Sequence, residues 1–161
     1  MAMTPEERVS AALERLALPS TVTTFPTSTH TAQGAADSVG CELGQIVKTL
    51  FFIADGRATV VLAAGDRQVD TSLLAPLLGV GRKKVKMGTA DQVLELTGYA
   101  VGGVAPVGLA TACDILVDDS LRRFDTVWAA AGTSNSVFAA NTEALMAAVH
   151  GQWAAVTRTP Q

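Results

Sequence analysis

One lysine stands near the start of an otherwise apolar, β-prone segment, GQIVKTLFFI, at residues 44–53. Burial of an ammonium group costs free energy unless the group finds a partner. Lys48 has two ways to meet this cost. Its aliphatic stem can pack on the core while the charge reaches water, or the charge can face an anionic part of a ligand. The segment taken alone favours the first interpretation.

A second segment that could do chemistry is TGYAVGGVAPVG, residues 97–108, which we call the glycine-rich segment. Glycine permits positive φ and close approach of the backbone, while Pro106 fixes the local course of the chain. Such a loop can present backbone N–H groups to a phosphate, an oxyanion or a carbonyl group. It can equally be a tight connection between two elements, and its residues alone leave both interpretations open.

Polar residues also gather in the segment AAGTSNSVF, residues 130–138, where an apolar run ends. Their hydroxyl and amide groups could bind a small ligand, although the same residue types are common in turns. A lone histidine in the segment STHTA could line a pocket or cap a helix. The candidate ligand-binding residues of these two segments are His30, Gly132, Thr133, Ser134 and Asn135.

Charged residues cluster twice in a chain whose formal net charge is -3. The segment GDRQVD contains Asp66 and Arg67, which we expect to form a surface ion pair of little energetic weight. The segment GRKKVK, residues 81–86, could follow a phosphate backbone or form a solvated loop face. Net acidity argues against a generic nucleic-acid coat, but it permits a local basic face.

Helices and strands must position these segments, and the pattern of apolar and capping residues predicts where they lie. Helices are predicted at residues 4–17, 32–39, 70–79, 89–98 and 141–151, with Thr4 and Thr142 as N-caps of the first and last. Strands are predicted at residues 21–25, 46–54, 58–65 and 152–158, with a hairpin turn at Asp55-Gly56. Residues 112–120 and 124–132 are each predicted to contain a short strand. We therefore expect one α+β domain over residues 1–161, in which helices surround a mixed, twisted sheet.

Length and composition exclude several classes. A chain of 161 residues suits one domain with one sizeable core. No apolar segment reaches the roughly 20 residues of a membrane span, and no signal-peptide layout occurs, so we expect a cytoplasmic protein without membrane contact. The cysteines and histidines show no metal spacing, and no P-loop, dinucleotide fingerprint or hydrolase elbow is present. We expect neither a metal nor a cofactor.

Six segments taken in chain order resemble the YbaK/EbsC family: GQIVKTLFF, VVLAAGDRQVD, KKVKM, TGYAVGGVAPVG, ILVDDSL and WAAAGTSNSVF. That family is similar to the editing domain inserted in bacterial prolyl-tRNA synthetases. The resemblance covers about residues 30–157. It implies a free-standing trans-editing deacylase, which hydrolyses the ester bond of a mischarged aminoacyl-tRNA carrying a small amino acid. The expected tRNA is tRNA(Pro).

The resemblance also implies roles for residues. Lys48 matches the functional lysine of the family, and its ammonium would bind the terminal phosphate or stabilise developing negative charge. Backbone groups of Gly102 and Gly103 would position the aminoacyl carbonyl and the terminal ribose. A bound water would be the nucleophile, because the chain offers no credible catalytic triad.

The rest of that loop, Val104, Ala105 and Pro106, is assigned to substrate binding by the same resemblance. Val104 and Ala105 differ from the pair typical of cysteinyl-tRNA deacylases in the family, which leaves the edited amino acid open. Contacts with the tRNA body are expected from charge alone, at Arg57, Arg67, Lys83, Lys84 and Lys86. Partnership with prolyl-tRNA synthetase and homodimer formation are left open.

Two other function classes stay in view. The chain could be a non-catalytic module that binds a tRNA end or a nucleotide in a regulatory role, although Lys48 together with an intact Gly102-to-Pro106 loop favours the enzyme. It could also hydrolyse simple amino-acid esters, but the missing nucleophile and base count against that reading.

Overall fold

The computed structural model describes residues 3–28 and 31–160, which form a mixed sheet of eight strands with helices around it. The strand order is β1-β8-β7-β2-β3-β6-β9, and β5 pairs with β2 off this path. These strands are β1 (Thr23–Thr24), β2 (Ile46–Ala54), β3 (Arg57–Ala64), β5 (Val85–Met87), β6 (Asp114–Asp118), β7 (Thr126–Ala130), β8 (Ser136–Asn141) and β9 (Gln152–Ala154). A separate two-stranded sheet joins β4 (Gln68–Val69) and β10 (Thr157–Arg158).

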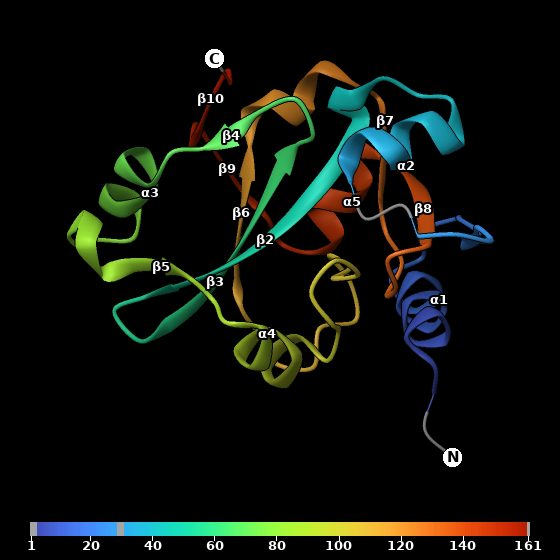
Figure 1. Cartoon of the computed structure of the whole chain (residues 1–161), viewed down its shortest axis with the longest axis horizontal. Helices are drawn as coiled ribbons and strands as arrows, with labels where there is room; N and C mark the ends of the chain where they lie inside the picture. Colours follow the sequence, from blue (N-terminus) through green and yellow to red (C-terminus); the bar gives the residue numbers. More distant parts are fainter. Residues whose placement is uncertain (1–2, 29–30, 161) are drawn as a thin grey trace.

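The long hairpin of β2 and β3 lies at the centre of the main sheet (Figure 1). The two strands pair antiparallel over their whole length. Asp55 and Gly56 connect them with positive φ angles of 50° and 81°, as a type I′ turn requires. The hairpin predicted from the Asp-Gly pair is confirmed.

Parallel and antiparallel pairs are combined in this sheet. β2 runs parallel to β7, β3 to β6, and β6 to β9. The pairs β2–β3, β2–β5, β7–β8 and β1–β8 are antiparallel. Parallel neighbours need long crossover connections, so helices are brought onto the faces of the sheet. The predicted α+β fold with a mixed sheet is confirmed.

Capping residues set most helix boundaries. Among the described residues the α-helices are α1 (Pro5–Arg15), α2 (Ala32–Val39), α3 (Thr71–Leu77), α4 (Ala90–Thr97) and α5 (Thr142–Ala148). Single 3-10 turns are η1 (Leu43–Gln45), η2 (Arg82–Lys84) and η3 (Asp119–Arg123). Thr4 forms the predicted N-cap of α1 as part of a capping box with Glu7. The prediction of Thr142 as a cap is wrong, because the Asn141 carboxamide caps α5 and Thr142 is its first residue.

Other strands differ from the sequence prediction, which contains neither β4 nor β5. β8 was missed, because its polar start continues a turn-like run of hydroxyl and amide residues. The strand predicted at residues 152–158 is two short strands, β9 and β10, which belong to different sheets. Val156 between them is fully buried, so the chain turns there to place one apolar side chain in the core.

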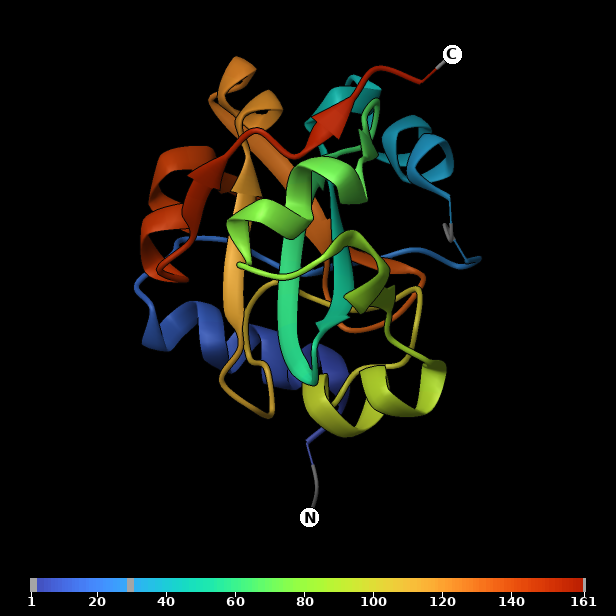
Figure 2. The same cartoon turned by 90° about the vertical axis from the view of Figure 1, so that its left-hand side faces the viewer.

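The two faces of the sheet carry different helices (Figures 1 and 2). On one face, α1, α4 and α5 pack against alternate strand residues such as Phe51 and Leu62. On the other face, α3 packs against Phe52 and Val61, and α2 packs against Ile46. Successive side chains of a strand point to opposite faces, so burial on both faces explains why β2 and β3 are almost continuously apolar.

Arg8 ties α1 to the glycine-rich segment. Its guanidinium donates hydrogen bonds to the backbone carbonyls of Gly98 at 2.8 Å, Thr97 at 3.1 Å and Gly108 at 2.6 Å. The same group lies 4.5 Å from the centre of the Tyr99 ring. A planar guanidinium with several N–H donors suits such a set of acceptors. The first helix therefore fixes both ends of this segment.

We predict that Arg8→Met lowers the free energy of unfolding by about 2 kcal/mol, because three carbonyl groups lose a shared charged donor. Equilibrium unfolding in urea measures the change. Arg15→Met, in the exposed last turn of the same helix, is the matched control and should change stability by about 0.5 kcal/mol or less. Equal losses in the two variants would contradict the bracing role of Arg8.

Candidate functional site

A gap in strand pairing lies along one edge of β2. On the edge opposite β3, β7 pairs with Ile46 and Val47, and β5 pairs with residues 52–54. Within the described residues, no strand pairs with residues 48–51 on this edge. β5 and β7 lie toward opposite ends of β2 (Figure 1).

The open edge exposes main-chain hydrogen-bonding groups. The Phe51 carbonyl on this edge accepts a hydrogen bond of 2.9 Å from the Gly88 amide. Because backbone groups alternate along a strand, the amide and carbonyl of Thr49, two residues earlier, face the same edge. An open strand edge of this kind can bind an extended or polar ligand through its backbone.

A cavity of about 300 Å³ occupies this gap. Its walls come from β2, β7, the start of α2, the residues after β5, the glycine-rich segment and the turn that precedes β8. Most of the lining is apolar. The polar lining residues are Thr31, Lys48, Thr49, Thr133, Ser134 and Ser136. No histidine, cysteine or carboxylate is among the lining residues that the structure describes.

Several residues predicted from the sequence meet at this cavity. Those that line it are Lys48, Gly102, Val104, Thr133 and Ser134. Gly103, Ala105 and Gly132 are buried next to these residues without lining the cavity, and Asn135 is also outside the lining. Pro106 lines a second hollow beside β6 instead. His30 lies outside the described residues.

Close packing of two loops explains two of the predicted glycines. A Cβ atom on Gly103 would lie 2.7 Å from Cα of Thr133 and 2.8 Å from the carbonyl oxygen of Gly132. A Cβ atom on Gly132, whose φ is 102°, would lie 2.8 Å from the backbone of Pro5. The start of α1, the turn before β8 and the glycine-rich segment are therefore stacked in backbone contact. Gly102 has a φ of 94°, so a side chain there would strain the turn at the cavity wall.

The side chains of the turn before β8 hold the turn itself. The Thr133 hydroxyl lies 2.9 Å from Oδ1 of Asn135 and 2.6 Å from the Ser136 hydroxyl. The Asn135 amide donates to the Phe25 carbonyl at 2.8 Å, which anchors the chain next to β1. Asn135 thus has a structural partner, while Thr133 and Ser134 reach the cavity.

The ammonium group of Lys48 donates a hydrogen bond to the backbone carbonyl of Arg67. Lys48 is half-buried on the face of β2 opposite Val47 and Phe51. Burial lowers the pKa of Lys48, and the nearby carboxylate of Asp66 acts in the opposite direction. The lysine thus neither lies free in water nor forms a direct ion pair among the described residues.

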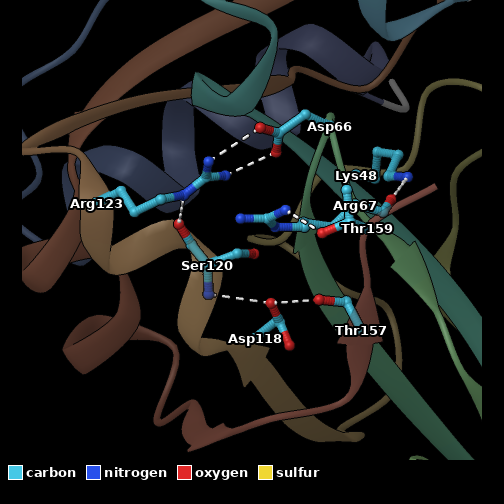
Figure 3. Close-up of polar contacts among 8 residues, drawn as sticks. All are labelled: Lys48, Asp66, Arg67, Asp118, Ser120, Arg123, Thr157 and Thr159. Atoms are coloured by element: carbon cyan, nitrogen blue, oxygen red, sulfur yellow. Dashed lines mark hydrogen bonds and ion pairs between the residues drawn. The ribbon is translucent and has the colours of Figure 1, made fainter. Parts of the chain in front are cut away.

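The predicted ion pair between Asp66 and Arg67 is wrong. Asp66 accepts two hydrogen bonds from Arg123 of η3, at 2.6 and 2.9 Å (Figure 3). These bonds are the main reason why the pKa of Asp66 is lowered. The Arg67 guanidinium donates instead to the Thr159 hydroxyl at 2.7 Å. Adjacent residues in a turn point apart, so each finds a partner from a distant part of the chain.

Sequence reasoning missed Thr49, Phe51 and Trp128, which also line the cavity. The hydroxyl of Thr49 is buried and has no hydrogen-bond partner among the described residues. Such an unpaired group is uncommon in a folded protein. The position of Thr49 next to Lys48 could have suggested it, but the gap beside it depends on the pairing of three strands.

The basic segment lies near one end of the cavity. Arg82, Lys83 and Lys84 belong to η2 and Lys86 to β5, and all are exposed. The next residues, Met87 and Gly88, line the cavity. We call these four cations the basic surface. It continues from the cavity rim toward the turn of the central hairpin, where the Asp55 amide donates to the Lys84 carbonyl.

Residues 3–28 and 31–160 contain no group of three or more His, Cys, Asp or Glu side chains that could hold a metal ion. None of the helices in this part of the chain is long and apolar enough to cross a membrane.

Comparison with known proteins connects this site to a family. Residues 27–148 match the family model described as the aminoacyl-tRNA editing domain. The chain belongs to the aminoacyl-tRNA editing family. The resemblance to the editing domain of prolyl-tRNA synthetases drawn from the sequence is confirmed.

Individual relatives of the family differ in length and in the names that they carry. The uncharacterized protein YwhH of Bacillus subtilis is 40% identical over 116 residues, which are 71% of this chain and 72% of YwhH. EbsC of Enterococcus faecalis, a candidate Cys-tRNA(Pro)/Cys-tRNA(Cys) deacylase, is 28% identical over 127 residues, or 78% of this chain and 76% of EbsC. The proline–tRNA ligase of Maridesulfovibrio salexigens is 39% identical over 80 residues, or 50% of this chain but 13% of the ligase.

A solved structure matches nearly the whole chain. The crystal structure of a candidate trans-editing enzyme for prolyl-tRNA synthetase superposes with a TM-score of 0.89 at 36% identity. The superposition covers 98% of this chain and 99% of the other. That structure therefore shares with this chain both the central sheet and the elements that surround it.

We predict that Asp66→Asn lowers the pKa of Lys48 further, because the carboxylate that opposes the effect of burial loses its charge. Titration of the Lys48 side chain by NMR measures the shift. Asp119→Asn removes an exposed carboxylate that pairs with Arg122 at 3.7 Å, and it serves as the charge-matched control. An unchanged Lys48 pKa in Asp66→Asn would show that the two groups are not coupled.

Proposed function

We propose that this protein hydrolyses the ester bond of a mischarged aminoacyl-tRNA that carries a small amino acid. One observation carries the proposal: the cavity brings Lys48, the open edge of β2 and the Gly102 loop together in a member of the editing family. The names of EbsC and of the superposed structure support the same activity.

The reaction needs a water nucleophile and stabilisation of negative charge. The water oxygen attacks the ester carbonyl carbon, the bond to the ribose oxygen breaks, and that oxygen takes up a proton to leave intact tRNA. The backbone of Gly102 would hold the carbonyl group, since Gly103 lies outside the cavity lining and its amide donates to the Ala100 carbonyl at 3.0 Å. The Lys48 ammonium would stabilise charge on the oxyanion or bind the terminal phosphate. Both roles of Lys48 need its protonated form.

The described cavity lining offers no general base, since no histidine, cysteine or carboxylate is present among these residues. A free hydroxyl of the terminal ribose can take part in activating the water, which removes the need for a base from the protein. A covalent intermediate on Lys48 is unnecessary for ester hydrolysis, and we assign the lysine an electrostatic role.

Size exclusion would set the specificity of the site. Small amino acids differ by about 1–3 kcal/mol of binding per methylene group, so a synthetase pocket separates them poorly. An editing cavity that rejects the larger, correct amino acid solves this problem by shape. The mostly apolar walls around Val104 and Trp128 favour a small side chain over a charged one.

The basic surface would bind the acceptor end of the tRNA. Its lysines, Lys83, Lys84 and Lys86, adjoin the cavity rim at Met87, so a strand whose terminal nucleotide enters the cavity passes near them. Relatedness to part of a proline–tRNA ligase supports tRNA(Pro) as the substrate and prolyl-tRNA synthetase as a partner. The Arg67 guanidinium is bonded to Thr159, so its predicted contact with tRNA is the weakest of this group.

We predict that Lys48→Met reduces kcat/KM for deacylation about 100-fold or more, because a donor that stabilises transition-state charge is lost. The measurement is release of labelled amino acid from alanyl-, seryl-, cysteinyl- and threonyl-tRNA(Pro). Arg15→Met, an exposed cation on α1, should retain wild-type activity.

The same panel can contradict the proposal. If no aminoacyl-tRNA is hydrolysed at micromolar enzyme while tRNA still binds, the protein is a binding module. Hydrolysis of simple amino-acid esters at the same rate as the aminoacyl-tRNA would instead indicate an esterase without tRNA recognition.

We predict that replacing Lys83, Lys84 and Lys86 together by alanine weakens tRNA binding and lowers its salt dependence. The slope of log K against log salt should fall by about 1 for each lost phosphate contact. Binding is measured by fluorescence anisotropy over a range of KCl concentrations, with Arg15→Ala as the control. An unchanged slope would place the tRNA on another surface.

A further inference from the structure

The position of Lys48 depends on a turn that lies outside the main sheet. Its ammonium donates to the carbonyl of Arg67, and residues 65–67 connect β3 to β4. The Arg67 amide donates to the Ala64 carbonyl at 3.0 Å, which closes the turn. A carbonyl in a short turn is fixed only as well as the turn itself, so the contacts of these residues decide where the ammonium is held.

One side of this turn is clamped by η3. Arg123 donates two hydrogen bonds to Asp66, and its Nε donates to the Ser120 carbonyl at 2.7 Å. The bidentate geometry is the most directional that an arginine and a carboxylate can make. This clamp comes from a segment within the range of the family model.

The other side is held by the C-terminal segment, residues 156–159. The Thr159 hydroxyl accepts a hydrogen bond of 2.7 Å from the Arg67 guanidinium, and β10 pairs antiparallel with β4. The Asp70 amide donates to the Val156 carbonyl at 2.8 Å just after β4. β4, which follows the carbonyl group that accepts the Lys48 hydrogen bond, is thus paired with β10. β10 lies beyond residue 148, where the match to the family model ends.

Asp118 fastens this C-terminal segment to the main sheet. It is 2% exposed and lies at the end of β6. Its carboxylate accepts a hydrogen bond from the Val156 amide at 2.9 Å. It also accepts hydrogen bonds from the Thr157 hydroxyl at 2.8 Å and the Ser120 amide at 3.0 Å (Figure 3). Burial alone would raise the pKa of Asp118, but these hydrogen bonds lower it overall. A buried carboxylate needs such partners, so segment and sheet are joined at this point.

We propose that the C-terminal segment is a positioning element for Lys48, acting through the Arg67 carbonyl, with Asp118 as its anchor on the sheet. The activity part of this inference rests on the proposed function. The hydrogen bonds described for Thr159 and Asp118 reach no residue that lines the cavity. Both residues therefore act on Lys48 through Arg67, as positioning residues. Displacement of a catalytic group by about 1 Å can cost 100-fold in rate, so a partial loosening is measurable.

The test compares Thr159→Val with Thr159→Ser in the full-length chain. Valine keeps the shape of threonine but removes the acceptor of the Arg67 hydrogen bond, and serine keeps the hydroxyl. We expect Thr159→Val to lower kcat about 10-fold with KM within about 2-fold, while Thr159→Ser retains wild-type values. Thr24→Val, an exposed threonine on the edge strand β1, is the matched control for the substitution itself.

A second readout does not depend on catalysis. NMR titration of labelled lysine side chains, with Lys48→Met used for assignment, reports the Lys48 pKa in the free protein. Loss of a well-placed carbonyl acceptor destabilises a half-buried ammonium, so the pKa of Lys48 should fall in Thr159→Val but not in Thr159→Ser. Asp118→Asn should shift it in the same direction, provided that thermal unfolding shows a folded protein.

The outcomes separate this inference from the proposed function. An unchanged Lys48 pKa and an unchanged kcat in Thr159→Val would overturn the positioning role. A wild-type protein without deacylase activity would refute the proposed function, and a lowered Lys48 pKa in Thr159→Val would still support the positioning role in that case.

Discussion

The half-buried ammonium of Lys48 needs an acceptor, and the acceptor that it finds is a backbone carbonyl in a turn. A turn has no ladder of hydrogen bonds to fix it, so support must come from elsewhere. Asp66 receives that support from η3 and Arg67 receives it from the end of the chain. The turn after β3, η3 and the C-terminal segment therefore meet near the Lys48 side chain of β2.

The opposite wall of the cavity depends on a different kind of contact. There the backbone of the glycine-rich segment lies against the turn before β8, which lies in turn against Pro5. Glycine at positions 103 and 132 permits this because no Cβ atom separates the chains. Arg8 fixes the ends of the same segment through three carbonyl groups. Hydrogen bonds thus fix the residues around Lys48, and close backbone packing fixes the glycine-rich segment. Both Lys48 and this segment line the cavity.

Local signals in the sequence were sufficient for much of this architecture. The Asp-Gly turn and the Thr4 N-cap are short-range features, and the structure contains both of them. Lys48 and the glycine-rich segment were also recognised in the sequence as residues that could take part in a reaction. Their meeting at one cavity could not be derived from spacing, because they are far apart in the chain and come together only through the strand order.

The features that the sequence did not reveal are long-range. Arg123 as the partner of Asp66 is 57 residues away, and no local pattern selects it over the adjacent Arg67. The gap along β2 exists because β7 and β5 pair with its two ends, and no other described strand pairs with the middle on that edge. Cavity residues such as Thr49 and Trp128 therefore look like ordinary strand residues until the pairing is known.

The open edge of β2 has a consequence for how such a site can diversify. Main-chain amide and carbonyl groups are present whatever side chain a residue carries, proline excepted. A ligand anchored on the Thr49 backbone would keep that anchor when neighbouring cavity walls change in size or polarity. Substitutions in the walls can therefore change the size and polarity of the cavity while these backbone groups stay in place.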